Sequence, residues 1–222
     1  FMEKEIYFEL KNNSGDIMTI YRDEPNVVPL SDEWTRTLCR CYTWMVGWDS
    51  IQPHRYPNPS DFIDGYTKQG LTAKIKSEKS TLCEIISEVV VRLYTEGNIY
   101  AVPLYVKPIL DYHSNLEFTT IYSSDNDFVG FAFATREEIY RWFNIKRITK
   151  SIENEILTMV NRELAIYNEY LKGATYHYVI KTADGTEIDH GLDFYELDGD
   201  TDKMLELMLK DSSVYDKSFK EI

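Results

Sequence analysis

A long amphipathic segment that runs directly into a tight hairpin constrains this chain more than any other feature. From Thr149 to Gly173 apolar residues recur at helical spacing, charged residues fill the other side, and a glycine stands at the C-cap position. Residues 176–181 are then rich in aromatic and β-branched types, and Asp184-Gly185 is a pair typical of a hairpin turn. Residues 186–190 can return antiparallel. We therefore expect a helix of about six turns that packs on a β-hairpin.

The first third of the chain predicts a second hairpin and then a helix. Residues 5–10 and 17–21 flank the turn-forming run Asn12-Asn-Ser-Gly15. Ser31 is a good N-cap for a helix that continues to residue 48. One apolar stripe along this expected helix holds Trp34, Leu38, Cys41, Tyr42, Met45 and Trp48. Residues 49–60 contain three of the prolines, which exclude regular structure, so we expect a loop there.

The middle of the chain changes from helix to strands. A short helix is expected over residues 60–69, followed by a solvated loop at 72–80 that carries Lys74, Lys76 and Lys79. A helix should then run from Thr81 to Gly97. Three strands are predicted after it, over residues 99–106, 116–122 and 128–134. Thr135 and Glu138 have the spacing of a capping box and predict the start of a further short helix.

These elements predict an α+β fold with a mainly antiparallel sheet built from hairpins and three to five helices packed against it. With 222 residues and 43% hydrophobic content, the chain can bury a full core. We expect one compact domain over residues 2–222, with a subdivision near 97–99 as the alternative. Met2 is taken as the natural start, with Phe1 preceding it. A C-terminal tail over residues 199–222 should hold a short helix.

The net charge of −13 is unevenly distributed along the chain. Residues 184–222 hold twelve acidic residues and four lysines, which leaves −5 for the 183 residues before them. Such a field repels nucleic-acid phosphates and favours a basic protein surface, so we expect no direct nucleic-acid binding. The acids that we assign to a candidate interaction surface are Asp189, Asp193, Glu196, Asp198, Asp200 and Asp202.

The sequence also bounds the compartment and the cofactors. No signal peptide is recognisable and no apolar run reaches the roughly 18 residues of a membrane span, so we expect a cytoplasmic protein that does not enter a membrane. Cys39, Cys41 and Cys83 are an odd number with poor spacing for a disulfide or a zinc site, and are expected to be buried, reduced thiols. Phosphate-binding loops and hydrolase motifs are absent, and no cofactor is expected.

Two groups of side chains could carry chemistry. Asp111 and His113 follow one predicted strand, and Asp125 and Asp127 lie in the turn between the next two. If they converge, they could bind a divalent ion or act as an acid and base pair, although aspartates in turns more often bond to the local backbone. His177 and His190 should share a face of the last hairpin, where they could ligate a metal, but a third ligand is missing.

Several longer motifs resemble those of a family of uncharacterised proteins encoded by phages and related mobile elements. They are the run Phe128-Val-Gly-Phe-Ala-Phe-Ala-Thr-Arg-Glu-Glu, Lys146-Arg-Ile-Thr-Lys, Tyr167-Asn-Glu-Tyr-Leu-Lys-Gly173, Tyr176-His-Tyr-Val-Ile and Asn98-Ile-Tyr-Ala-Val-Pro-Leu-Tyr105. This chain departs from the family at Asp189-His-Gly-Leu-Asp-Phe-Tyr195, where relatives tend to read Asp-Ser-Cys-Trp-Gly-Phe-Tyr-Gly.

The resemblance implies a bacterial host as the setting, with no established reaction. Together with the acidity, it leads us to expect an accessory protein that inhibits a host factor in the manner of anti-CRISPR or anti-restriction proteins. The expected partner is a host protein or nucleoprotein complex with a basic surface. Two alternatives remain open: a metal-dependent hydrolase that uses Asp111, His113 and Asp125, and a structural accessory whose tail forms a homodimer.

Overall fold

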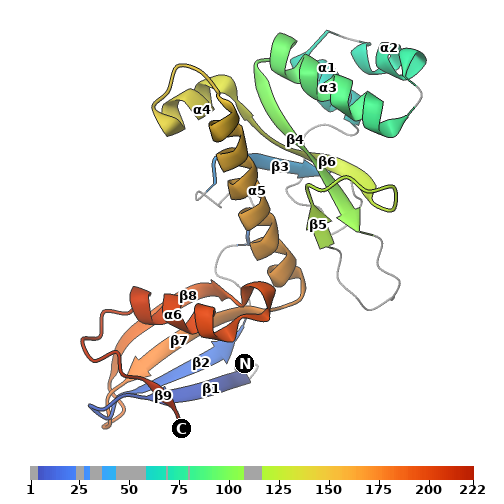
Figure 1. Cartoon of the computed structure of the whole chain (residues 1–222). Helices are drawn as coiled ribbons and strands as arrows, with labels where there is room; N and C mark the ends of the chain where they lie inside the picture. Colours follow the sequence, from blue (N-terminus) through green and yellow to red (C-terminus); the bar gives the residue numbers. More distant parts are fainter. Residues whose placement is uncertain are drawn as a thin grey trace. The chain divides into compact units, whose positions relative to one another are not determined.

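The computed structural model describes residues 5–23, 28–30, 37–43, 59–68, 70–79, 81–107 and 117–222 (Figure 1). The chain divides into two compact units, whereas the sequence predicted one. Unit 1 comprises Phe1–Pro29 and Ile166–Ile222, and unit 2 comprises Leu30–Ala165. The residues near 97–99, where a subdivision was considered, lie inside unit 2. The physical reason is that two sheets form in place of one, and each has its own buried core.

Unit 1 is a five-stranded antiparallel sheet with a helix on one side. Its strands run in the order β8-β7-β2-β1-β9, with β1 at Glu5–Lys11, β2 at Ile17–Arg22 and β7 at Thr175–Lys181. The edges are β8, Glu187–Tyr195, and the two-residue β9, Lys220–Glu221. Both predicted hairpins are therefore confirmed. Between β8 and the helix a short 3-10 turn, η1, spans Leu197–Gly199.

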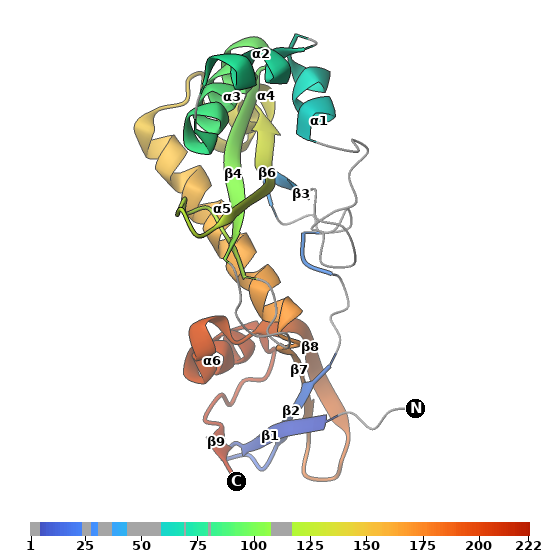
Figure 2. The ribbon, with the colours of Figure 1, turned by 90° about the vertical axis from the view of Figure 1, so that its right-hand side faces the viewer.

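Helix α6, Thr201–Asp211, covers one side of this sheet (Figure 2). It buries Met204 and Met208 against strand residues such as Tyr178 and Ile180, which lie on the same face of β7. The tail that the sequence left without a docking partner thus packs on its own unit. Its last strand pairs with β1.

Unit 2 is built on a four-stranded antiparallel sheet in the order β3-β6-β4-β5. The strands span Arg40–Thr43, Asp127–Thr135, Ile99–Lys107 and Glu117–Thr119 in that order. Helices α1, Pro59–Tyr66, α2, Leu71–Glu78, and α3, Leu82–Glu96, cover one face, where Phe62 and Leu93 pack on Phe131 and Phe133.

The other face of the unit 2 sheet carries the alternate strand residues and faces α5, Lys150–Leu171 (Figure 1). Thr120 donates a hydrogen bond of 2.7 Å to Asn161 of this helix, and Ile156, Val160 and Leu164 are buried along it. Helix α4, Arg136–Phe143, precedes it and begins with the predicted capping box. The α+β class is confirmed, with six α-helices in the part of the chain that is described.

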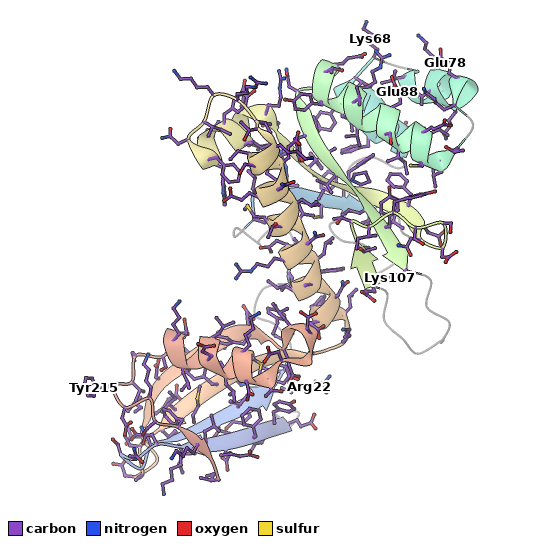
Figure 3. All side chains as sticks on the ribbon, viewed as in Figure 1. Arg22, Lys68, Glu78, Glu88, Lys107 and Tyr215 are labelled. Atoms are coloured by element: carbon purple, nitrogen blue, oxygen red, sulfur yellow. The ribbon has the colours of Figure 1, made fainter. Side chains whose placement is uncertain are left out.

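The long helix ends as its sequence predicts. Gly173 has a φ of +69°, the left-handed conformation of a C-cap glycine. Arg22 at the end of β2 (Figure 3) donates to the carbonyl of Gly173 at 2.7 Å and to that of Lys172 at 3.2 Å. These carbonyls have no partner within the helix, so the arginine satisfies them.

The helix predicted from Ser31 is wrong in its described part, because residues 40–43 form strand β3. Cys41 and Thr43 are buried on one face, and Tyr42 packs edge-to-face on Phe133 from the other. Pairing with β6 satisfies the backbone of this segment and buries alternate side chains on the two faces of the sheet, a pattern with the period of a strand and not of a helix. Residues 31–36 and 44–58 lie outside the described residues.

One smaller expectation also changes. The lysine-bearing segment predicted as a loop forms helix α2, because Leu71 and Ile75 are one turn apart and both reach the core.

Strand β3 approaches β6 very closely at Gly130, where an added Cβ would lie 1.9 Å from the carbonyl oxygen of Tyr42. Only glycine fits there.

Candidate functional site

Half of the acids assigned to an interaction surface bond within unit 1. The carboxylate of Asp189 accepts hydrogen bonds from the backbone and hydroxyl of Ser213, at 2.6 and 3.1 Å. Glu196 accepts from Tyr176 at 3.2 Å and also from Thr201. Asp200 is the N-cap of α6 and accepts from the backbone of Lys203 at 2.9 Å. These three carboxylates hold the fold of unit 1.

The remaining candidates face solvent or lie at its edge. Asp193 is half-buried and has a φ of +61°, at an irregular point of β8. Asp198 and Asp202 are exposed, and their carboxylates make no hydrogen bond or ion pair with any residue that the structure describes. Glu206, which the sequence analysis did not single out, has the same environment one turn after Asp202. Asp198, Asp202 and Glu206 thus form the acidic side of α6 and its approach.

Helix α6 presents more than charge. Leu207, which is next to the buried Met208 in the sequence, is 46% exposed. Beyond the end of the helix, Tyr215 is completely exposed and points away from unit 1 (Figure 3). We call the set Asp198, Asp202, Glu206, Leu207 and Tyr215 the α6 surface.

The two residues that follow Tyr215 are fixed by hydrogen bonds to other parts of unit 1. The carboxylate of Asp216 accepts from Ser14 and Ser218, and its carbonyl accepts from Asn12 at 3.0 Å. The Lys217 ammonium donates to the carbonyl of Leu209 at 2.6 Å and to that of Ser212 at 3.0 Å, and so caps α6. An exposed aromatic ring on a clamped backbone loses little conformational entropy when a partner covers it.

Only part of the predicted acid–histidine site lies within the described residues. Asp111 and His113 lie outside the described residues. Asp125 lies in the turn before β6, where its backbone N–H donates to the Ser123 hydroxyl and its carboxylate accepts from Ser124, both at 3.3 Å. Its neighbour Asp127 begins β6 and is exposed. These are the local bonds of a turn.

The two strand histidines have separate environments. His190 lies opposite Val179 as predicted, is exposed, and has its Nδ1 3.4 Å from Glu187. His177 is buried, stacks on Tyr21 with ring centroids 5.0 Å apart, and has its Nδ1 3.9 Å from Asp23. Among the residues that the structure describes, no three His, Cys, Asp or Glu side chains are grouped to hold a metal ion.

The cysteines are free thiols in two different settings. Cys39 and Cys41 are buried, as predicted, and burial raises the pKa of Cys39 to about 12 and that of Cys41 well above its usual value. Both stay protonated at neutral pH and are poor nucleophiles. Cys83 is exposed, which corrects the expectation that all three are buried, because the first turn of α3 faces solvent.

A basic corner between α4 and α5 was missed by the sequence analysis. Arg141, Lys146, Arg147 and Lys150 are all exposed, and no acidic residue occurs between Glu138 and Glu153. Trp142, which is 50% exposed, lies among them. The signal was present in the sequence as four cations within ten residues, but the net charge of the chain concealed it. We call these five residues the corner patch.

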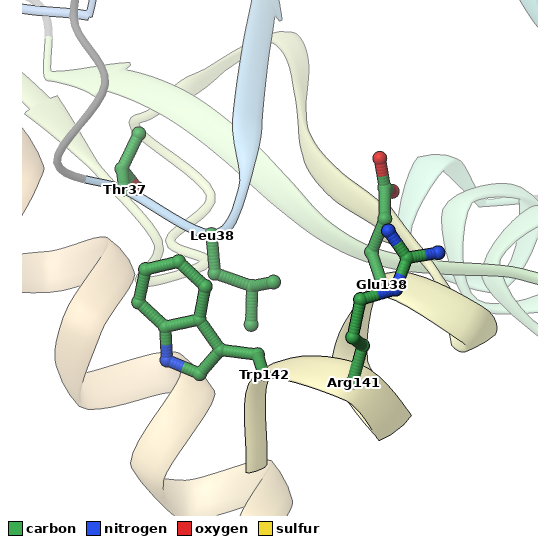
Figure 4. Close-up of a pocket in the computed structure, with 5 residues that line it drawn as sticks. All are labelled: Thr37, Leu38, Glu138, Arg141 and Trp142. Atoms are coloured by element: carbon green, nitrogen blue, oxygen red, sulfur yellow. The ribbon is translucent and has the colours of Figure 1, made fainter. Parts of the chain in front are cut away.

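Beside the corner patch is a hollow of about 300 Å³ (Figure 4). Thr37, Leu38 and the Trp142 ring form one part of its wall, and Glu138 and Arg141 form the other. Burial raises the pKa of Glu138. Hydrogen bonds from Thr135 and the charges of Arg40 and Arg141 together lower the pKa by more than burial raises it, so the net shift is downward. Arg40 binds this carboxylate at 3.0 Å.

None of the helices in the described ranges combines the length and the apolarity that a membrane crossing requires. Comparison with protein-family models, curated proteins and solved structures gives no significant match to this chain.

Proposed function

We propose that this protein is a phage or mobile-element accessory that binds and inhibits a host factor through the α6 surface of unit 1. The partner is a host protein or nucleoprotein complex with a basic surface. Inhibition would follow if the acidic side of α6 covers cations that otherwise hold DNA or RNA, as anti-CRISPR or anti-restriction inhibitors do. The family resemblance described above supplies the bacterial setting of this proposal.

The observation that carries the proposal is the separation of charge between the units. Unit 1 holds 19 acidic and nine basic residues, whereas unit 2 holds 18 and 15. Within unit 1, several carboxylates are used for internal bonds, but Asp198, Asp202 and Glu206 are not bonded to any residue of the described ranges. They are therefore available to attract a basic partner from solution.

The apolar members of the α6 surface give a partner something to bury. Leu207 is flanked by charged residues, and Tyr215 lies beyond the other end of the helix from Asp198. An eleven-residue helix is about 16 Å long, so an interface of the usual size could cover both ends. Tyrosine is a frequent anchor at such interfaces because it combines apolar area with one polar atom.

A tagged full-length chain, immobilised and exposed to nuclease-treated bacterial lysate, tests the proposal. The informative variants are Asp198→Asn/Asp202→Asn/Glu206→Gln and Tyr215→Ala. Asparagine is chosen at position 198 because Asp198 has a φ of +59°, a conformation that asparagine tolerates. The matched controls are Glu78→Gln/Glu137→Gln/Glu155→Gln, which removes three exposed charges from unit 2, and Tyr122→Ala, which removes a half-exposed tyrosine.

We expect a captured partner that is released by high salt and by excess duplex DNA, and that both informative variants fail to retain. Stopped-flow mixing with the purified partner should show that the charge variant slows association more than it speeds dissociation, because charges at the rim of an interface steer encounter. Tyr215→Ala should mainly speed dissociation. Retention that is equal for the informative variants and their controls would refute the proposal.

A further inference from the structure

We propose that the corner patch of unit 2 is a binding site for single-stranded nucleic acid, with Trp142 as the stacking platform and the surrounding cations as phosphate ligands. This inference does not depend on the proposed function, because it concerns the other unit. It revises the expectation of no direct nucleic-acid binding, which rested on the net charge of the whole chain.

The cations of the corner patch are open to an anionic ligand. The side chains of Arg141, Lys146 and Arg147 make no hydrogen bond or ion pair with residues in the described ranges. The fourth cation, Lys150, is 3.3 Å from Glu153, but its side chain is 83% exposed. Ion pairs of this kind are weak in water, so a phosphate can replace the carboxylate.

The nearest acidic group does not cancel the patch. Glu138 accepts hydrogen bonds from the backbone and the hydroxyl of Thr135, at 2.7 and 2.9 Å, and forms its ion pair with Arg40. Its ion-pair partner is therefore a cation outside the corner patch, while the charge of Arg141 also acts on it. Most of the net negative charge of the protein lies in unit 1, at −10 against −3 for unit 2.

The exposed ring of Trp142 favours a nucleic acid over other anions. Trp142 is half-exposed and forms part of the wall of the hollow, beside the apolar side chain of Leu38 and across from Arg141 (Figure 4). Flat nucleobases stack on aromatic rings, while basic residues beside the ring bind the backbone. A base stacked on Trp142 in the hollow would place a phosphate near Arg141, which lines the same hollow. A paired base within a duplex has no free face to offer, which favours a single strand.

Cations at the end of a helix can also serve only to cap that helix. Arg141 is in the last turn of α4 and can interact with its carbonyl end. Lys146, Arg147 and Lys150 come after Asn144, whose φ of +51° ends the helix. Capping of α4 therefore explains one cation of the four.

The test is fluorescence anisotropy of a labelled oligonucleotide of twelve thymidines with the full-length chain in 50 and 200 mM salt. Four phosphate contacts to a single strand predict a salt slope of about −2.8, or a loss of roughly fiftyfold between these concentrations. Arg141→Gln/Lys146→Gln/Arg147→Gln should abolish binding at 50 mM salt. Trp142→Ala should weaken it about tenfold or more, through the lost stacking.

A matched control removes the same charge from the same unit. Lys74→Gln/Lys76→Gln/Lys79→Gln changes three exposed lysines on and after α2, and should leave the affinity within about twofold. Circular dichroism and thermal melting confirm that each variant is folded. A duplex of the same length and a glutamate peptide of the same charge are the competing ligands.

Three outcomes would overturn the inference. The first is no binding of the oligonucleotide by the wild-type chain at 50 mM salt. The second is equal weakening by the lysine control, which would mean that any cations suffice. The third is tighter binding of the duplex or the glutamate peptide with no effect of Trp142→Ala, which would assign the patch to a different ligand.

Discussion

Asp216 accepts two hydrogen bonds from Ser14, one from its backbone N–H at 3.1 Å and one from its hydroxyl at 2.8 Å. The other carboxylate oxygen accepts from the backbone and hydroxyl of Ser218, at 3.1 and 2.6 Å. One side chain near the C-terminus therefore ties the tail to the turn between β1 and β2, more than 200 residues earlier in the chain. Hydrogen bonds from Ser218 and then Ser14 lower the pKa of Asp216 from 3.8 to about 2.

This bonding predicts a pH-dependent contribution of Asp216 to stability. A carboxyl whose pKa is lower in the folded state stabilises the fold above its unfolded pKa, near 4, and loses that effect as the pH falls through about 2. Asp216→Asn should therefore melt below the wild type at pH 7 and at pH 5, and the gap should close toward pH 2. Thermal melts of both proteins across this range measure it.

Asp202→Asn is the control for that titration, because Asp202 bonds to no described residue. Its melting temperature should follow that of the wild type throughout. Hydrogen exchange of residues 213–222 should also be faster in Asp216→Asn at pH 7. An unchanged exchange rate there would mean that the tail is held by other contacts.

Two neighbouring residues of α6 should respond very differently to truncation. Met208 is completely buried in the core of unit 1, and Met208→Ala should cost about 2–5 kcal/mol of unfolding free energy through the lost contacts and the cavity. Leu207 is 46% exposed, and Leu207→Ala should change stability by less than about 0.5 kcal/mol. Urea denaturation of the two variants measures both. Similar losses would contradict the docking of α6 by its methionine side.

Asp200 is expected to stabilise α6 as an N-cap rather than to serve an interface. Asp200→Ala should cost about 1 kcal/mol, because the backbone N–H of Lys203 loses its acceptor. Asp200→Asn keeps an acceptor oxygen and should cost much less, although it removes the same charge. Chemical denaturation of the pair separates the two effects. Equal losses would show that the charge, and not the cap, is what stabilises the helix.

Replacement of Gly130 or Gly70 by alanine should lower the stability of the protein by different amounts. In Gly130→Ala the new Cβ would collide with the backbone of β3 at 1.9 Å, so strands must separate, and we expect a loss above about 2 kcal/mol. At Gly70 no atom lies within 4 Å of the added Cβ, and only the φ of +79° opposes it, which costs about 1 kcal/mol. Melting curves of the two variants should rank in that order, and the reverse order would contradict the β3–β6 approach.

The elements that the sequence predicted correctly are those encoded within a few residues. The capping box of Thr135 with Glu138 joins groups three residues apart, so its spacing alone identifies the helix start. Gly173 ends α5, and Asp184-Gly185 turns β7 into β8 with Val179 opposite His190, for the same reason. Each of these signals lies within a few residues of the sequence and can be recognised without any knowledge of tertiary contacts.

Residues 40–43 and the acidic region show what only the tertiary structure decided. The apolar stripe from Trp34 to Trp48 fits a helix, but pairing with β6 makes the described part a strand, because a distant neighbour satisfies its backbone. Likewise, a count of acids cannot separate Asp189, whose partner is Ser213, from Asp198, which stays in solvent. Composition determines the net charge, whereas the fold determines which charges are already satisfied, because hydrogen bonds between residues far apart in sequence exist only after the chain has folded.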